Sequence, residues 1–148
     1  MDNAKIRKII LVEHEGLRGN LTTIEALLDD VSKGDVPAMQ NAHQQLTNML
    51  QTFLRHIEHE EQILQPVLAK IDAWGPQRKA AMDKEHHLQR ALVQQLLDLN
   101  PANDPGAWAR DVRVFAKDLL LDMADEEKTC LSPNVLRDDV VVVDGSSE

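Results

Sequence analysis

The sequence predicts an all-α protein that folds as an up-down-up-down antiparallel four-helix bundle. Three observations support this prediction. Helix-breaking residues divide most of the 148-residue chain into four long segments, and apolar residues recur within them at steps of three and four, as in amphipathic helices. The connections between the segments are short, which favours antiparallel neighbours. Leu, Ala, Gln and Glu are abundant, and these residues favour helices over strands.

Glycine, proline and capping residues set the expected ends of the helices. Gly34 ends the first segment, and Asp104 and Pro105 are expected to form the N-cap and first turn of the fourth. Pro66 lies inside the second segment and should kink it. We expect the helices over residues of about 3–33, 36–71, 76–99 and 104–132.

The expected domain organisation is one bundle followed by a tail. Residues 1–133 contain the four helical segments and should form one domain, with enough apolar residues for a hydrophobic core. Residues 134–148 form a C-terminal tail that contains the β-branched run Val140–Val143. We expect this tail either to be disordered or to pack on a neighbouring surface.

Composition excludes several classes of function. The formal net charge is −9 without a basic cluster, which argues against a nucleic-acid partner. No apolar run approaches the length of a membrane span, and Ile9–Val12 is too short for a signal peptide. The single cysteine, Cys130, allows no internal disulfide. We therefore expect a cytoplasmic protein with no membrane partner.

Polar residues interrupt the apolar stripes at positions that should be buried. In the first helix, His14 lies between Ile10 and Leu17, and in the second the stripe reads Phe53, His56, Glu60, Ile63 and Val67. In the third helix His86 takes such a position, and in the fourth Asp122 and Glu126 follow Leu119 in the stripe. Burying such groups is costly unless they are paired or bound to a metal. The six interrupting residues are His14, His56, Glu60, His86, Asp122 and Glu126.

These residue types are suited to a metal site inside a bundle. Side chains four residues apart on a helix point the same way, and imidazole and carboxylate suit iron, manganese or zinc. Three histidines and three carboxylates suffice for two ions and leave positions open for a small ligand. Taken singly, each residue has another explanation: a hydrogen-bonded core histidine, a buried polar pair, or a solvated acidic patch.

Residues beside the stripes have other expected roles. His59, His87 and Glu61 should lie on the surface or behind the ligands, and Glu13 is expected to be solvated. Arg90 could point inward to a bound anion or outward into solvent. Cys130 is expected to be a small packing residue.

With these residues in order along the chain, the sequence resembles the hemerythrin-like family of HHE cation-binding domains. The segment from Leu54 to Pro66 is similar to the family's second-helix motif, and the resemblance covers about residues 5–133. It implies a di-iron centre in an antiparallel bundle. By this resemblance His14 and His56 would hold one iron, His86 and Asp122 the other, and Glu60 and Glu126 would bridge them.

Two positions depart from the family's pattern and bear on the function. Asp122 stands where the family usually has histidine, and Arg90 stands where oxygen-carrying members have a second histidine. A ligand set richer in carboxylate stabilises ferric iron and favours oxidation chemistry, sensing or storage over reversible oxygen carriage. The expected partner is a small diatomic or peroxide ligand, and we also consider a homodimer.

Two other functions fit the sequence. One is a bundle that has lost its metal and acts as an interaction protein, with Asp122 and Arg90 as its best support. The other is a histidine phosphotransfer module, because His43 lies in a segment that faintly resembles a phospho-acceptor site.

Overall fold

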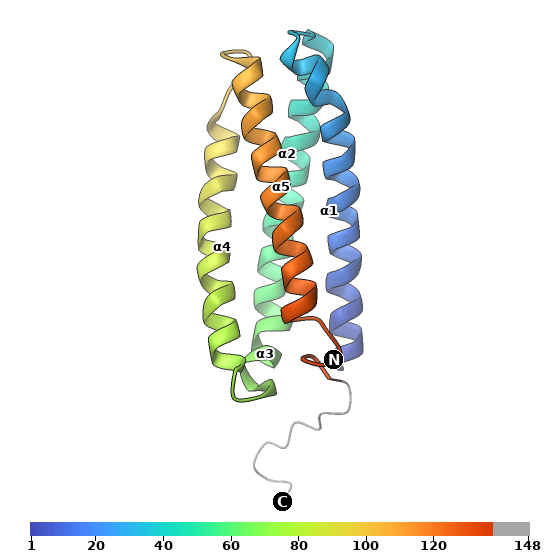
Figure 1. Cartoon of the computed structure of the whole chain (residues 1–148), viewed down its shortest axis with the longest axis vertical. Helices are drawn as coiled ribbons and strands as arrows, with labels where there is room; N and C mark the ends of the chain where they lie inside the picture. Colours follow the sequence, from blue (N-terminus) through green and yellow to red (C-terminus); the bar gives the residue numbers. More distant parts are fainter. Residues whose placement is uncertain (138–148) are drawn as a thin grey trace, which may run out of the picture.

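The protein is a bundle of long helices that lie side by side, and the connections between successive helices lie at opposite ends of the bundle in turn (Figure 1). The computed structural model describes residues 1–137, and these contain no strand. The prediction of an all-α four-helix bundle is therefore confirmed. The four long helices are α1 (Asn3–Ser32), α2 (Val36–His59), α4 (Gly75–Asp98) and α5 (Pro105–Thr129).

Aspartates cap three of the four long helices at their N-termini. The side chains of Asp2, Asp35 and Asp104 each accept a hydrogen bond from the backbone N–H three residues later. Each bond satisfies one of the N–H groups that a helix start leaves without a partner. The predicted start of the last helix at Asp104 and Pro105 is confirmed.

The second predicted segment is not one regular helix: a short π-helical segment interrupts it just before Pro66. This segment, η1 (Glu60–Leu64), lies between α2 and the short helix α3 (Gln65–Ile71). A π-helical turn contains an extra residue, so it shifts the buried face by one position. Leu64 and Leu68 are buried, whereas the positions predicted from a regular helix, Ile63 and Val67, are only partly buried.

Two apolar clusters fill the bundle, and polar residues lie between them. The larger cluster contains Leu17, Phe53, Leu119 and Met123, among others. The smaller one contains Ile10, Leu64, Met82 and Cys130. Helices α1 and α4 have buried members in both clusters, whereas α2 and α5 contribute to the larger one and the segments that follow them contribute to the smaller one. The buried polar and charged residues are His14, His56, Glu60, Gln65 and His86.

The chain after α5 packs back onto the start of α1. Leu131 and Leu136 are buried in the smaller apolar cluster. The Arg7 side chain donates hydrogen bonds to the backbone carbonyls of both leucines, and Asn3 donates to the carbonyl of Arg137 at 2.7 Å. The packed chain therefore extends past residue 133, and the Val140–Val143 run lies outside the described residues.

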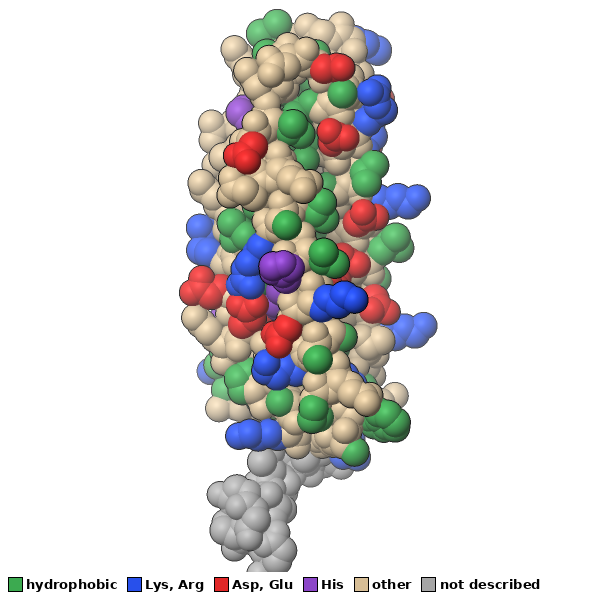
Figure 2. Space-filling view, turned by 90° about the vertical axis from the view of Figure 1, so that its left-hand side faces the viewer, with side chains coloured by type: hydrophobic (Ala, Val, Ile, Leu, Met, Phe, Trp, Pro, Cys, Tyr) green, Lys and Arg blue, Asp and Glu red, His purple; other side chains and the backbone are tan. Residues whose placement is uncertain are grey.

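Charged, histidine and hydrophobic side chains all lie on the surface of the α4 side (Figure 2). Figure 2 looks onto the α4 side and shows acidic, basic and histidine side chains together near mid-height, with hydrophobic side chains scattered along the molecule. Leu88 and Leu92 of α4 are among the exposed hydrophobic residues. None of the helices within residues 1–137 has the length and hydrophobicity that crossing a bilayer requires.

Gly75 gives a test of the sharp turn between α3 and α4. A Cβ atom at this position would lie 2.1 Å from the Leu68 carbonyl oxygen, so no larger residue fits without a backbone shift. We expect Gly75→Ala to lower the free energy of unfolding by about 1–3 kcal/mol, the usual range for overpacking. Chemical denaturation of both proteins measures the difference.

Gly19→Ala is the matched control. A Cβ at Gly19, within α1, would meet no atom of the described chain within 4 Å. Because alanine favours helix, this change should stabilise the protein by about 0.5–1 kcal/mol. Equal effects of the two substitutions would contradict the close approach at Gly75.

Candidate metal centre

Five of the six interrupting residues, all except Asp122, form a polar layer across the middle of the bundle. His14 comes from α1, His56 from the end of α2, Glu60 from the first residue of η1, and His86 from α4. These four side chains are almost fully buried, with exposed fractions between 0% and 5%. Glu126 joins them from α5, with a side chain that is 17% exposed. All four long helices therefore reach the same layer.

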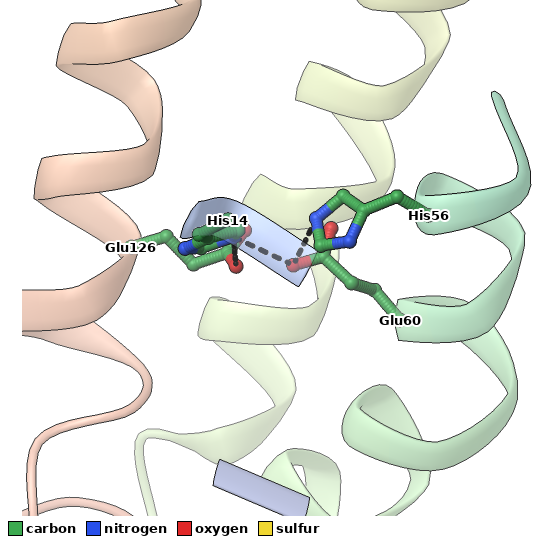
Figure 3. A group of neighbouring side chains, drawn as sticks. All are labelled: His14, His56, Glu60 and Glu126. Carbon is green, nitrogen blue, oxygen red and sulfur yellow. Dashed lines mark ion pairs between the residues drawn. The ribbon is translucent and has the colours of Figure 1, made fainter. Parts of the chain in front are cut away.

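Four of these residues point toward one another (Figure 3). His14, His56, Glu60 and Glu126 each offer one ligand atom, and these atoms all lie within 4.8 Å of one another. The His14 Nε2 atom is 3.1 Å from Glu126 Oε1 and 3.8 Å from Glu60 Oε2. The His56 Nε2 atom is 3.3 Å from the same Glu60 oxygen. Nitrogen and oxygen donors in this arrangement can hold a metal ion.

Three buried atoms in this group lack a hydrogen-bond partner. Within residues 1–137, His14 Nε2, Glu60 Oε2 and Glu126 Oε1 make no hydrogen bond of acceptable geometry. A buried polar atom without a partner is costly, and such atoms are rare in folded proteins. Three of them facing one another fit a bound cation, because a cation would satisfy all three at once.

Each histidine of the layer is held from behind by a carboxylate. The Nδ1 atom of His14 lies 2.7 Å from Glu127, that of His56 lies 2.7 Å from Glu13, and that of His86 lies 3.0 Å from Glu61. A neutral imidazole that donates its Nδ1–H to such a carboxylate keeps the Nε2 lone pair free. The Nε2 atoms face the centre, as metal-binding histidines with outer carboxylates do.

The three carboxylates behind the histidines, called here the outer carboxylates, are themselves paired with arginine or histidine side chains. They are Glu13, Glu61 and Glu127. Arg18 makes two contacts of 2.9 Å with Glu127, and Arg90 makes two contacts of 2.6 and 2.8 Å with Glu61. Glu13 receives His59 Nδ1 at 2.6 Å in addition to His56. Glu13 is therefore part of the site and not freely solvated.

Of the two residues expected to hold a second ion, His86 lies in the polar layer and Asp122 does not. His86 is in the layer, with Nε2 at 3.0 Å from Glu60 Oε1. Asp122 is half-buried between α4 and α5, where Gln89 donates a hydrogen bond of 3.3 Å to it. Met123, which is 3% exposed, takes the core position that the sequence had indicated for Asp122. Asp122 is thus outside the group of four converging residues.

Burial and close contacts shift the pKa values of three residues in the layer. Burial lowers the pKa of His14, but contacts with Glu126 and Glu60 outweigh burial and raise it to about 10. Burial and the neighbouring Glu60 raise the pKa of Glu126 well above its usual range. Burial opposes the ionisation of Glu60, yet the surrounding groups hold its pKa well below the usual range. A metal ion would compete with these protons for the same atoms.

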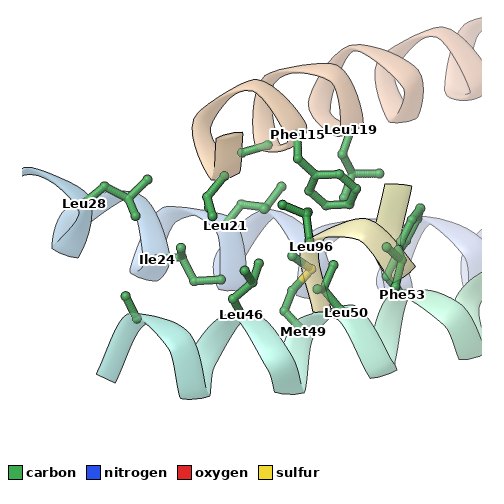
Figure 4. Close-up of a cluster of buried hydrophobic side chains, with 14 of the residues drawn as sticks. Leu21, Ile24, Leu28, Leu46, Met49, Leu50, Phe53, Leu96, Phe115 and Leu119 are labelled. Atoms are coloured by element: carbon green, nitrogen blue, oxygen red, sulfur yellow. The ribbon is translucent and has the colours of Figure 1, made fainter. Parts of the chain in front are cut away.

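The polar layer borders an apolar cluster, and two cavities have one of its residues in their lining. The larger apolar cluster, shown in Figure 4, borders the layer through Phe53, whose ring stacks on His56 at 6.3 Å. A cavity of ≈ 510 Å³ reaches His56 from the surface, and one of ≈ 280 Å³ reaches Glu126 beside Glu85. Each cavity thus has one residue of the layer in its lining.

Comparison with protein families bears directly on this geometry. The sequence matches the hemerythrin HHE cation-binding domain over residues 5–132, most of the chain. The chain belongs to this family. The resemblance inferred from the sequence is therefore confirmed. No curated protein and no solved structure matches the chain significantly.

The sequence indicated the buried members of this hemerythrin-like site and allowed for His59 and Glu61 behind them, but it did not indicate Glu13, Glu127 or Arg18. Glu127 and Arg18 had no signal of their own, because surface carboxylates and arginines are common on helices. Their places in the sequence could have indicated the two glutamates, because Glu13 directly precedes His14 and Glu127 directly follows Glu126. Two successive residues of a helix point in different directions. Glu13 of α1 therefore reaches His56 of α2, and Glu127 of α5 reaches His14 of α1. His43 of α2 lies outside the layer, edge-on to Trp108 at 6.1 Å.

The reactivity of Cys130 at different pH values tests whether its thiol is buried in the smaller apolar cluster. Burial raises the pKa of its thiol to about 11. Because the thiolate is the reactive form, at pH 8 only about 0.1% of such a thiol is ionised, against about a quarter of an ordinary cysteine. We expect iodoacetamide to alkylate the folded protein far more slowly than the denatured protein at pH 8. The rate should rise about tenfold per pH unit toward pH 11, and equal rates in both states would contradict this assignment.

Proposed function

We propose that this hemerythrin-like bundle binds a dinuclear iron centre and uses it to sense or handle dioxygen, peroxide, nitric oxide or iron. One observation carries the proposal: three histidine Nε2 atoms face two buried carboxylates, and three atoms of this group lack hydrogen-bond partners among residues 1–137. Hydrogen bonds satisfy most buried polar groups in a protein that binds nothing there. The family match, which describes cation binding, supports the same conclusion.

The shape of the layer supports two ions. The two oxygens of Glu60 face opposite sides, one toward His14 and His56 and the other toward His86. We propose that His14 and His56 hold one ion, that His86 and Asp122 hold the second, and that Glu60 and Glu126 lie between them. Manganese or zinc could occupy the same donors, because imidazole and carboxylate bind several divalent metals.

The chain's own residues define what such a centre can do. Bound iron would supply redox chemistry and open positions for a small ligand. The outer carboxylates orient the imidazoles, and the apolar cluster at Phe53 excludes water from one side. The donor set contains as many carboxylates as histidines, which favours the ferric state. We therefore propose sensing or turnover of an oxygen-derived ligand in preference to reversible oxygen carriage.

Metal content of purified protein tests the proposal. Wild-type protein reconstituted with ferrous iron should contain about two ions per chain, and its visible spectrum should change between anaerobic and air-exposed samples. His56→Ala or Glu60→Ala should deplete the metal, because each removes a converging ligand atom. His87→Ala is the control, since His87 is an exposed histidine next to His86. A wild-type protein that stays free of metal after reconstitution would refute the proposal.

Thermal unfolding distinguishes the metal centre from a metal-free interaction bundle. A ligand present at about 100 times its Kd stabilises the folded state by about 2.7 kcal/mol. For a chain of this size, chelation should therefore lower the Tm by roughly 5–10 °C. An unchanged Tm after exhaustive chelation would favour the metal-free alternative, in which the polar layer is held by its own contacts.

Asp122 tests the number of ions. If Asp122 holds the second ion, Asp122→Ala should reduce the content from about two ions to about one per chain, and His14→Ala should do the same from the other side. Elemental analysis measures the ratio. An unchanged content in Asp122→Ala would remove Asp122 from the ligand set and leave the rest of the site intact.

A further inference from the structure

Arg90 and Glu61 form a close pair at the edge of the polar layer. The guanidinium donates to both carboxylate oxygens of Glu61, at 2.6 and 2.8 Å. Such a two-pronged contact fixes the orientation of the carboxylate as well as its position. Glu61 belongs to η1 and Arg90 to α4, so the pair also joins the two segments that carry Glu60 and His86.

The pair continues inward through His86. Glu61 Oε2 accepts from Arg90 and lies 3.0 Å from His86 Nδ1, while His86 Nε2 lies 3.0 Å from Glu60 Oε1. Two successive residues of η1, Glu60 and Glu61, thus hold the same imidazole at its two nitrogens. An unbroken series of polar contacts leads from an exposed guanidinium to the buried centre.

We propose that Arg90 is a positioning residue for metal binding, which acts through Glu61 to keep the His86 Nε2 lone pair directed at the centre. The proposal rests on the function proposed above. Glu61 has 28% of its side chain exposed, so water competes for its oxygens. Arg90 holds both oxygens in one orientation, and Glu61 is then available to accept the Nδ1–H of His86. Without this restraint, the ring can rotate or change tautomer.

The other histidines show the same arrangement, which makes an accidental surface ion pair a poor explanation. Arg18 orients Glu127 behind His14, and His59 contacts Glu13 behind His56. Arg90 is the most suitable of the three for a test. Its side chain is 43% exposed, so its replacement leaves no cavity in the core.

The experiment compares Arg90→Met with Arg113→Met. Arg113 is a matched control, because it also pairs with two carboxylates, Glu25 and Asp29, away from the polar layer. Zinc affinity is measured by competition with a chelator of known affinity. We expect Arg90→Met to bind zinc about 10–100 times more weakly than wild type, the usual effect of losing an outer-sphere partner. Arg113→Met should stay within about twofold.

Graded variants separate positioning from charge. Arg90→Lys keeps the charge but loses the planar two-pronged contact, so its affinity should fall between those of wild type and Arg90→Met. Glu61→Gln keeps an oxygen acceptor for His86 Nδ1 and should lose less affinity than Glu61→Ala. If Arg90→Lys and wild type bind equally, or if Arg113→Met loses as much as Arg90→Met, a general charge effect replaces the positioning role.

Nitrogen NMR of the histidine rings provides a readout without metal. In chelator-treated protein, Arg90→Met should shift the Nδ1 and Nε2 signals of His86 and leave those of His56 in place. Unchanged His86 signals together with unchanged zinc affinity would overturn the inference. If wild-type protein binds no metal, the proposed function fails, whereas the ring signals still show whether Arg90 positions His86.

Discussion

Glu60 is a carboxylate with 2% of its surface exposed, and its charge has to be compensated by groups that come from every other part of the bundle. His14, His56, His86 and Glu126 all approach it, one from each long helix. An isolated buried carboxylate would be far too costly to keep ionised. The register of the four helices is therefore tied to this residue, since a shift of any helix by one turn would withdraw its partner from Glu60.

Most of the fold could be predicted because the helix ends carry clear local signals and the apolar residues follow a regular period. Gly34 placed the boundary between α1 and α2 within a few residues, and Asp104 with Pro105 placed the start of α5. The period failed at η1, where a π-helical turn moved burial from Ile63 to Leu64. That turn begins at Glu60, and π-helical turns are frequent at functional sites. The deviation that a regular pattern cannot predict thus coincides with the centre of the site.

The candidate site was predictable in its interior and not at its periphery. A buried histidine stands out in an apolar stripe, whereas Glu13, Glu61 and Glu127 lie on helix flanks where a solvated and a functional carboxylate have the same sequence signal. On α5 three successive leucines, 119–121, left the phase of the helix open. Only packing decides that Met123 enters the core and that Asp122 lies beside Gln89.

The uneven packing of α4 has a consequence for how the protein opens. This helix buries only five residues and packs mainly on α3, with few contacts to α2 and α5. Near its middle, His86 and Arg90 contact Glu60 and Glu61 of η1 through polar groups. Local unfolding follows the weakest attachment. The polar contacts of His86 and Arg90 therefore hold the middle of α4 against η1, and breaking them is expected to let this helix separate from the bundle more often.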